Sequence, residues 1–315
     1  MISASKDMPV FNFSAESESM IIQVPKYFSY KETLHYLTRS TQECLHQVVS
    51  GEIYKVLVID QQKILVRIKE SGHSFLELKI VDGSDKSESM HRKAAEYTAD
   101  WLDLTTDLDP FYQIANNDPI LGSLTRKFEG LRIIGVPDLF EALTWAVIGQ
   151  QINLAFAYTL KKRLVEAYGE KHVWAEQAFW TFPAPETIAS LSAENLRELQ
   201  FTGKKAEYVI GIAKLIADGK ITKENLLRDR NVKGIEEKLL SIRGIGPWTA
   251  NYCMMRCLRI SSSFPFGDAA LNKALQNAGF KERKLSREEM EEIFLPWSPW
   301  EAYAVFYFWR SLSKE

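Results

Sequence analysis

Cysteine is scarce in this 315-residue sequence, which contains only Cys44, Cys253 and Cys257. Three cysteines cannot build the disulfide framework of a small secreted domain, so we expect a reducing, cytoplasmic setting. Long apolar runs are also missing: no stretch of about 18 apolar residues occurs, which argues against a membrane-spanning helix. The first twenty residues lack the basic and then apolar pattern of a secretory signal.

An excess of charge of either sign is absent as well. The 39 Lys and Arg residues nearly balance the 41 Asp and Glu residues, which gives a formal net charge of −2. This balance neither indicates nor excludes a nucleic-acid partner. With 46% hydrophobic and 25% charged residues, the composition is that of an ordinary globular protein, and the length suggests two or three domains.

The order of the hydrophobic patterns predicts an α+β protein with two main parts. Residues 1–20 are polar and are predicted to form a flexible arm. Residues 21–112 contain short Val-, Ile- and Leu-rich segments with a period of two, as in half-buried antiparallel strands, and two amphipathic helices near residues 31–39 and 84–104. Residues 113–315 carry about eight helical patterns and almost no strand, so we expect a mostly helical domain there.

A short segment rich in glycine lies between two helical patterns at residues 235–259. Gly244 and Gly246 predict a very tight turn, because glycine tolerates positive φ without a Cβ clash. The amides near Gly244, Gly246 and Trp248 would then face outward at a helix N-terminus, where N–H groups and the helix dipole favour an anion. A plain corner between two packed helices explains the same glycines. However, residues 201–260 carry 12 Lys and Arg against 6 Asp and Glu, which favours a phosphate partner.

Several segments together resemble a known family. "LLSIRGIGPWTANY" followed by "FPFGDAALNKAL" is similar to the helix–hairpin–helix motif, the Gly/Pro-rich loop and the aspartate of a DNA glycosylase superfamily. "ALTWAVIGQQINLAFAYTL" and "PWEAYAVFYFW" extend the resemblance to the alkylpurine glycosylases of the AlkA type (3-methyladenine DNA glycosylase II). The resemblance spans roughly residues 120–312 and is weaker over the N-terminal part. It implies a two-lobed, mostly helical glycosylase domain after a small antiparallel-sheet domain.

Asp268 stands before an apolar periodic run, so its local pattern is that of a helix N-cap. The resemblance implies more, because Asp268 matches the catalytic carboxylate of the superfamily. Breaking an N-glycosidic bond develops positive charge on the sugar, and a fixed carboxylate stabilises that charge and orients water. Where bifunctional relatives such as endonuclease III carry a nucleophilic lysine, this chain has Trp248. We therefore expect a monofunctional enzyme that leaves an abasic site in an unbroken strand.

The resemblance also implies a base pocket and a set of DNA contacts. Trp248 and Tyr252 share one side of a helix. Trp309, with Tyr303 on the same predicted helix, matches an aromatic residue of the AlkA-type cleft. Aromatic faces suit an extruded alkylated purine, which is cationic, although most aromatic residues of such a chain form its core. The residues assigned to DNA contact are Arg243, Gly244, Gly246, Gln150 and Gln151.

Gln151 occupies the position of the residue that wedges into the duplex, where AlkA-type enzymes have an apolar side chain. A glutamine can fill the gap and hydrogen-bond the orphaned base, but it can also simply bridge or cap the helix pair. The resemblance further implies a Na⁺ or K⁺ ion at the hairpin, which would give the loop one more positive charge toward a phosphate. Its ligands would be backbone carbonyls near Leu240, Ile242 and Ile245. No other cofactor is expected.

An iron–sulfur cluster is not expected, because the chain has no cysteine after Cys257 and therefore lacks the four-cysteine motif of the endonuclease III branch. Cys253 and Cys257 are interpreted as buried small apolar residues. Nothing in the sequence indicates an oligomer, so we expect a monomer.

Three functional hypotheses follow. The first is a monofunctional DNA glycosylase that removes alkylated purines, such as 3-methyladenine and 7-methylguanine, from damaged duplex DNA in base excision repair. The second is a noncatalytic helix–hairpin–helix protein that binds DNA. The third is a monofunctional glycosylase for another damaged base. Asp268 at glycosylase spacing, together with the aromatic residues, favours the first.

Overall fold

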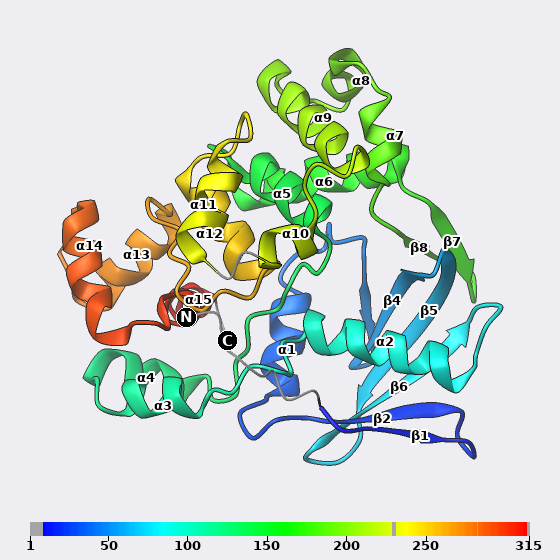
Figure 1. The fold of residues 1–315 in the computed structure, drawn as a ribbon. Coiled ribbons are helices and arrows are strands. Elements are labelled where there is room, and N and C mark those ends of the chain that lie inside the picture. The colour runs from blue at the N-terminus through cyan, green and yellow to red at the C-terminus, as the bar shows by residue number, and fades with distance from the viewer. Residues whose placement is uncertain (1–8, 229–230, 282, 314–315) are drawn as a thin grey trace.

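The structure, a computed structural model, describes residues 9–228, 231–281 and 283–313. It contains a six-stranded sheet, a two-stranded sheet and helices that gather into two lobes (Figure 1). This arrangement confirms the α+β class expected from the sequence, with the antiparallel sheet first and the mostly helical part after it. Among the described residues, no helix is both long and apolar enough to cross a lipid bilayer.

The N-terminal domain is built on the six-stranded antiparallel sheet and two helices. These elements are β1 (Phe11–Ser14), β2 (Ser19–Gln23), α1 (Tyr30–Leu37), β3 (Gln47–Val49), β4 (Glu52–Ile59), β5 (Gln62–Glu70), β6 (Phe75–Asp82) and α2 (Glu88–Trp101). The strand order is β1-β2-β6-β5-β4-β3. In β6, buried Leu76, Leu78 and Ile80 alternate with more exposed neighbours, as a strand with one covered face requires. Helix α2 packs against that face.

The sheet begins earlier in the chain than the sequence indicates. The prediction of a flexible arm over residues 1–20 is wrong for its described part, because β1 and β2 pair with each other and β2 pairs with β6. Residues 1–8 lie outside the described part of the chain. Phe11 and Phe13 of β1 pack against the core under the sheet, and their burial gives this polar segment a reason to fold.

The predicted boundary between residues 112 and 113 is also wrong. It falls inside helix α3 (Asp109–Asn116), and both Phe111 and Tyr112 belong to the core of a helical lobe. The helical part therefore starts before residue 113. Helix α3 has only eight residues, so its periodic pattern is too short to mark where the helical part begins.

The first helical lobe is centred on α5, which is almost entirely buried because α6, α9 and α12 all pack on it. The helices of this lobe are α5 (Leu139–Gly149), α6 (Leu154–Tyr168), α7 (Pro185–Ala189), α8 (Ala193–Glu198), α9 (Gly203–Ala217), α10 (Lys223–Arg228), α11 (Val232–Leu240) and α12 (Pro247–Arg256). Their apolar faces share one core. Helices α11 and α12 are the pair that residues 235–259 predicted.

The expectation of almost no strand after residue 112 is confirmed for the described residues, which contain one short hairpin there. Strands β7 (Lys171–Trp174) and β8 (Gln177–Trp180) pair after α6. Phe179 of β8 packs on Val56 and Leu65, on the face of the main sheet opposite α2. This contact also explains why β5 is buried at consecutive positions instead of alternating strictly.

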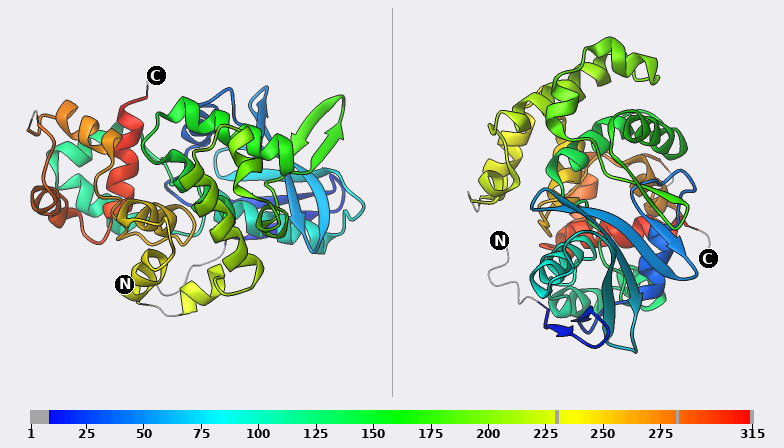
Figure 2. Two further views of the ribbon diagram at one scale, coloured as in Figure 1. Left: turned by 90° about the horizontal axis from the view of Figure 1, so that it is seen from above. Right: turned by 90° about the vertical axis from the view of Figure 1, so that its right-hand side faces the viewer.

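The second helical lobe combines segments from the middle and the end of the chain. Its elements are α3, α4 (Pro119–Lys127), α13 (Ala269–Asn277), α14 (Arg287–Phe294), the 3₁₀ turn η1 (Leu295–Trp297) and α15 (Glu301–Ser311). In the left view of Figure 2, the red α15 stands between α13 and α14 on one side and the green helices of the first lobe on the other. Trp309 of α15 packs against the cores of both lobes, so it marks their junction.

Candidate active site

The segment between α11 and α12 is the tight turn that its glycines predict. Gly244 has a φ of +94°, a left-handed conformation that glycine adopts without strain. A Cβ atom on Gly244 would lie 2.3 Å from the ring of Tyr208, so the turn also packs closely on α9. Gly246 departs from the expectation of positive φ, because its φ is −96°. A Cβ atom on Gly246 would meet no atom within 4 Å, so this side of the turn is open.

The start of α12 presents free backbone donors. Pro247, in the first turn, has no N–H to offer. In the part of the chain that the structure describes, the N–H groups of Gly244, Gly246, Trp248 and Thr249 make no hydrogen bond to other backbone groups. Unpaired donors at the positive end of a helix dipole form an anion site. The geometry therefore suits a phosphate at the position that the glycine pattern indicates.

Three residues assigned to DNA contact lie around this turn. Arg243 is exposed and forms an ion pair with a glutamate of α9 at 2.8 Å. Gln150 follows α5, and its Nε2 donates to the Gly244 carbonyl over 3.0 Å and to Thr249 Oγ1 over 2.9 Å. Gln151 is exposed in the loop between α5 and α6, with a φ of +56°. Gln150 thus ties this loop to the hairpin, and Gln151 projects from the joined surface.

Asp268 precedes α13, and three donors fix its carboxylate. The Leu271 N–H donates to Oδ1 over 2.7 Å, which is the N-cap bond that the local pattern predicts. The indole N–H of Trp309 also donates to Oδ1, over 2.9 Å, and that of Trp248 donates to Oδ2, over 3.0 Å. The structure therefore brings Asp268, Trp248 and Trp309 together from α12, the start of α13 and α15.

Tyr252 completes an aromatic group beside this carboxylate. Its ring stacks on Trp248 at a centroid distance of 5.2 Å and lies 6.2 Å from the ring of Trp309. Its hydroxyl oxygen accepts hydrogen bonds of 2.8 Å from Trp145 Nε1 and from Arg256 Nη1. Burial raises the pKa of the Tyr252 hydroxyl, so the side chain is neutral near pH 7. Trp145 and Arg256 lie within apolar helical patterns, so no separate sequence signal marks either residue.

Tyr303 does not belong to this group, although it shares α15 with Trp309. Its hydroxyl donates to Asp103, and its ring packs on Phe111 in the core of the second lobe. Six positions along an α-helix turn a side chain by about 240°, so residues 303 and 309 face different directions. The assignment of Tyr303 to the base pocket is therefore corrected: it is a core residue, 2% exposed.

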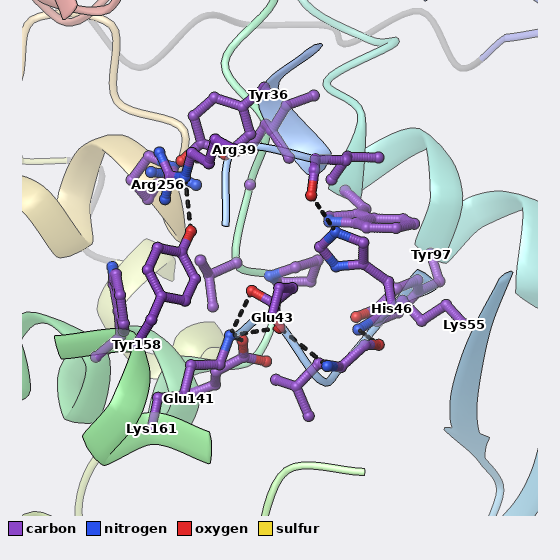
Figure 3. A pocket seen from close by; sticks show the side chains of 18 residues that line it. Tyr36, Arg39, Glu43, His46, Lys55, Tyr97, Glu141, Tyr158, Lys161 and Arg256 are labelled. Carbon is purple, nitrogen blue, oxygen red and sulfur yellow. Dashed lines mark hydrogen bonds and ion pairs between the residues drawn. The ribbon is translucent and has the colours of Figure 1, made fainter. Parts of the chain in front are cut away.

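A polar cavity of about 50 Å³ lies where the N-terminal domain meets the first lobe (Figure 3). At one end, Lys161 forms ion pairs with Glu43 at 3.1 Å and Glu141 at 3.5 Å. Burial opposes the ionisation of Glu43, but the neighbouring Lys161 holds the pKa of that carboxyl below its usual range. Trp145 and Arg256, the two donors to Tyr252, also line the cavity, and the Trp145 ring centroid lies 5.5 Å from Lys161 Nζ. Sequence reasoning missed this cavity because its lining comes from many separate segments.

The hairpin backbone and the two later cysteines offer atoms that could bind a metal ion. The Ile242 carbonyl accepts the Ile245 N–H over 3.0 Å, whereas those of Leu240 and Ile245 accept no backbone hydrogen bond within the described ranges. Oxygen donors of this kind suit a hard cation. Cys253 and Cys257 are fully buried, as expected, and their mutual contact and burial raise the pKa of the Cys253 thiol. Across the described residues, no cluster of three or more His, Cys, Asp or Glu side chains could hold a metal ion.

Two known families match the two parts of the chain. Residues 144–299 match the HhH-GPD superfamily of base excision DNA repair proteins, and residues 17–143 match the N-terminal domain of 8-oxoguanine DNA glycosylase. The chain is 43% identical to the DNA-3-methyladenine glycosylase of Bacillus subtilis over 297 residues, which cover 94% of this chain and 98% of the relative. It is 28% identical to DNA-3-methyladenine glycosylase 2 of Escherichia coli over 203 residues, 64% of this chain and 67% of that one.

Solved structures share the fold over nearly the whole chain. A 3-methyladenine DNA glycosylase from Archaeoglobus fulgidus superposes with a TM-score of 0.80 at 22% identity, covering 94% of this chain and 99% of that one. An 8-oxoguanine glycosylase/lyase from Clostridium acetobutylicum, in complex with double-stranded DNA, has a TM-score of 0.74 at 18% identity, covering 97% and 99%. These likenesses establish the fold alone. The family match and the 43% identity show that this chain belongs to the HhH-GPD superfamily of base excision DNA repair proteins, as an enzyme of the DNA-3-methyladenine glycosylase type.

Proposed function

We propose that this chain hydrolyses the N-glycosidic bond of alkylated purines, such as 3-methyladenine and 7-methylguanine, in duplex DNA and leaves the strand intact. The observation that carries the proposal is the carboxylate of Asp268, which two indole N–H groups and one backbone N–H hold beside an aromatic group. A mere N-cap needs only the Leu271 N–H. The two additional donors, Trp248 and Trp309, come from other helices and support a role beyond capping.

The chemistry assigned to Asp268 is electrostatic. As the bond from C1′ to the base lengthens, positive charge develops on the sugar, and a nearby carboxylate stabilises it. The same group orients the attacking water. Because Asp268 is already held in one orientation by its three donors, little reorganisation is needed when the charge develops.

The aromatic group supports the choice of substrate. Trp248, Tyr252 and Trp309 offer ring faces next to the carboxylate. Stacking against such faces suits an unstacked purine, and alkylation makes the purine cationic and a better leaving group. Weakly paired, damaged bases are also the least costly to extrude from the duplex.

The hairpin supplies the contact with the duplex. A DNA phosphate fits the free N–H groups of Gly244, Gly246 and Trp248, with Arg243 nearby. The exposure of Gln151 on the neighbouring loop supports its assignment to the gap that the extruded base leaves. These contacts hold the DNA backbone and fill a gap, so they carry no sequence information. We propose that the protein binds DNA as a monomer.

Trp248 also bears on the type of reaction. The residue after the Gly-Ile-Gly-Pro segment is an indole with no amine, so it cannot form a Schiff base with the sugar. The proposal is therefore a monofunctional enzyme that hydrolyses the base and does not cleave the strand. The three cysteines of the chain are too few for a four-cysteine iron–sulfur site.

A monovalent cation, Na⁺ or K⁺, is part of the proposal at the hairpin. The free carbonyls of Leu240 and Ile245 fit such an ion, while the Ile242 carbonyl already accepts the Ile245 N–H. When bound, the ion would supply positive charge near the phosphate. No step of the hydrolysis depends on it.

The experiment is base release from methylated duplex DNA by the purified chain. We expect free 3-methyladenine and 7-methylguanine by chromatography, an intact labelled strand in the absence of alkali, and no covalent complex after borohydride treatment. Strand cleavage or borohydride trapping would contradict the monofunctional mechanism. Duplex binding without release of any base would instead identify a noncatalytic DNA-binding protein.

One observation favours a second substrate class. Residues 17–143 match the N-terminal domain of 8-oxoguanine DNA glycosylase. A duplex with a single 8-oxoguanine therefore belongs in the same assay. Release of 8-oxoguanine without release of methylated purines would show that 8-oxoguanine, and not an alkylated purine, is the substrate.

A further inference from the structure

Three residues form a row along α12, from its outer end inward. Trp248, Tyr252 and Arg256 are spaced by four, so they lie on one side of the helix and each is about 6 Å further along its axis. Trp248 is half-buried and bonds to Asp268, while Tyr252 and Arg256 are 5% and 3% exposed. A purine whose sugar lies at Asp268 and whose ring stacks along this row therefore points its far edge toward Arg256.

Arg256 is a buried cation that has no carboxylate partner among the described residues. Its Nε donates to the Ile134 carbonyl over 2.6 Å, and its Nη1 donates to the Tyr252 hydroxyl over 2.8 Å. Its guanidinium lies 5.1 to 5.8 Å from the ring centroids of Tyr36, Tyr252 and Phe306. No ion pair within the described ranges includes Arg256. Burying a charge in this way is costly. A guanidinium has five donors, and two bonds from Arg256 to protein atoms are found in the described part of the chain.

The cavity of Figure 3 gives Arg256 space for a partner. Tyr36 and Arg39 line the cavity beside Arg256, and both guanidinium groups lie over the Tyr36 ring, at 3.9 Å for Arg39 and 5.1 Å for Arg256. The Tyr36 hydroxyl is buried and has no hydrogen-bond partner among the described residues. The carboxylates of the cavity, Glu43 and Glu141, are engaged by Lys161. The part of the cavity beside Arg256 therefore offers hydrogen-bond donors and positive charge.

We infer that Arg256 forms the far wall of the base pocket and donates hydrogen bonds to the acceptor edge of the extruded purine. The inference rests on the proposed function and adds a selectivity to it. A guanidinium only donates, and it pairs two donors with the O6 and N7 acceptors of a 6-oxopurine, whereas the N6 amino group of an adenine-type base offers it no acceptor. Among damaged purines, the pocket favours those with a carbonyl at C6, such as hypoxanthine.

The size of the cavity sets a condition on this arrangement. About 50 Å³ holds water molecules but is smaller than the space that an aromatic ring occupies. The purine ring therefore lies on the Tyr252 side, and only its carbonyl edge reaches toward the cavity. Positive charge at that edge also makes the far end of the pocket a poor place for a cationic ring, so Trp248 and Trp309 carry the stacking.

The test compares two duplexes that differ only in the damaged base, one with hypoxanthine and one with 3-methyladenine. Single-turnover release is measured for the wild type and for Arg256→Gln. A glutamine pairs with N6 and N7 of adenine-type bases. We expect hypoxanthine release to fall by about 10- to 100-fold, the cost of losing hydrogen bonds to a charged group, while 3-methyladenine release changes little.

Two further variants keep the test decisive. Arg132 is also buried and also donates to backbone carbonyls, but it lies between α3 and the N-terminal domain. Arg132→Gln should lower the melting temperature without changing the ratio of the two release rates. If Arg256→Gln fails to fold, Arg39→Gln replaces it, because Arg39 is exposed. Arg39→Gln should lower the ratio of hypoxanthine to 3-methyladenine release in the same direction, by a smaller factor.

The outcomes separate this inference from the proposed function. Equal loss of both activities in Arg256→Gln, as in Arg132→Gln, would show a structural arginine and overturn the inference. Release of 3-methyladenine but not hypoxanthine by the wild type would overturn it as well, with the proposed function intact. Release of neither base, nor of 7-methylguanine, by the wild type would remove the proposed function itself.

Discussion

The indole Nε1 of Trp309 donates to Oδ1 of Asp268 over 2.9 Å, although 41 positions separate the two residues. Trp248 makes the equivalent bond to Oδ2 from the hairpin helix, over 3.0 Å. The two tryptophans therefore do more than present ring faces, because they also fix the orientation of the carboxylate. This coupling ties the hairpin, α13 and the last helix into one unit.

The donor role of Trp309 is separable from its aromatic role. Trp309→Phe keeps a ring but removes the N–H that Asp268 accepts. We expect single-turnover base release to slow by about tenfold or more, since a hydrogen bond to a charged group is worth about 1.5–3 kcal/mol, with unchanged affinity for DNA. Trp174→Phe is the matched control, because Trp174 packs against Tyr54 in the N-terminal domain. A Trp309→Phe enzyme with the wild-type rate would limit Trp309 to stacking.

The two glycines of the hairpin should respond differently to the same change. Gly244→Ala places a Cβ atom 2.3 Å from the Tyr208 ring at a φ of +94°, so it should lower stability by about 1–3 kcal/mol and weaken DNA binding. Gly246→Ala meets no protein atom and has an ordinary φ. It should leave the melting temperature unchanged but weaken binding to all DNA sequences alike. If Gly246→Ala binds DNA as tightly as the wild type, the phosphate does not bind at the Gly246 amide.

The neighbouring glutamines form another matched pair. Gln150→Ala removes the two bonds that tie the α5–α6 loop to the hairpin, so it should cost about 1 kcal/mol of stability for each bond lost. Gln151→Ala removes an exposed side chain and should leave stability unchanged while lowering base release from a duplex. Thermal melts and release assays on both variants check this. If Gln151→Ala excises bases at the wild-type rate, another residue fills the gap.

His46, in the cavity wall, predicts a pH dependence of stability. Burial lowers the pKa of His46 to about 4, and its Nε2 donates to the Leu37 carbonyl over 3.0 Å. In the unfolded chain, His46 has an ordinary pKa of about 6.5, which is higher than its pKa in the folded protein. The free energy of unfolding that depends on neutral His46 is therefore complete above pH 6.5 and is lost as the pH falls toward 4. Urea unfolding at pH 7.5 and pH 5.0 should therefore show that the free energy of unfolding falls more for the wild type than for His46→Gln. Equal drops would mean that His46 is already charged in the folded protein.

Much of this site could be predicted where the chemistry is local or the motif is contiguous. The tight turn followed from Gly244, and the N-cap at Asp268 followed from its place before an apolar run. The resemblance added Trp248, Tyr252 and Trp309, and the structure places all three around Asp268. The fixed spacing of a family motif therefore predicts how its residues lie relative to one another.

Features that depend on tertiary contacts were not predictable from the sequence. β1 and β8 look polar or too short, and they fold because Phe11, Phe13 and Phe179 find apolar partners elsewhere. Tyr303 shares a helix with Trp309 but faces the other lobe. Arg256 lies within an apolar pattern, and its position at the end of the α12 row appears only once the N-terminal domain covers it. The positions of these residues depend on tertiary contacts between segments that are far apart in the sequence.

The proposed action of the Asp268 carboxylate on the sugar depends on its negative charge, which a single substitution removes. Single-turnover release of 3-methyladenine is compared between the wild type and Asp268→Asn, with the DNA affinity of each protein measured in the same buffer. An asparagine retains an oxygen that can accept the three hydrogen bonds but loses the negative charge. We expect at least about a 100-fold lower rate for Asp268→Asn, with nearly unchanged affinity for DNA. Wild-type turnover by Asp268→Asn would contradict it and reduce Asp268 to the cap of α13.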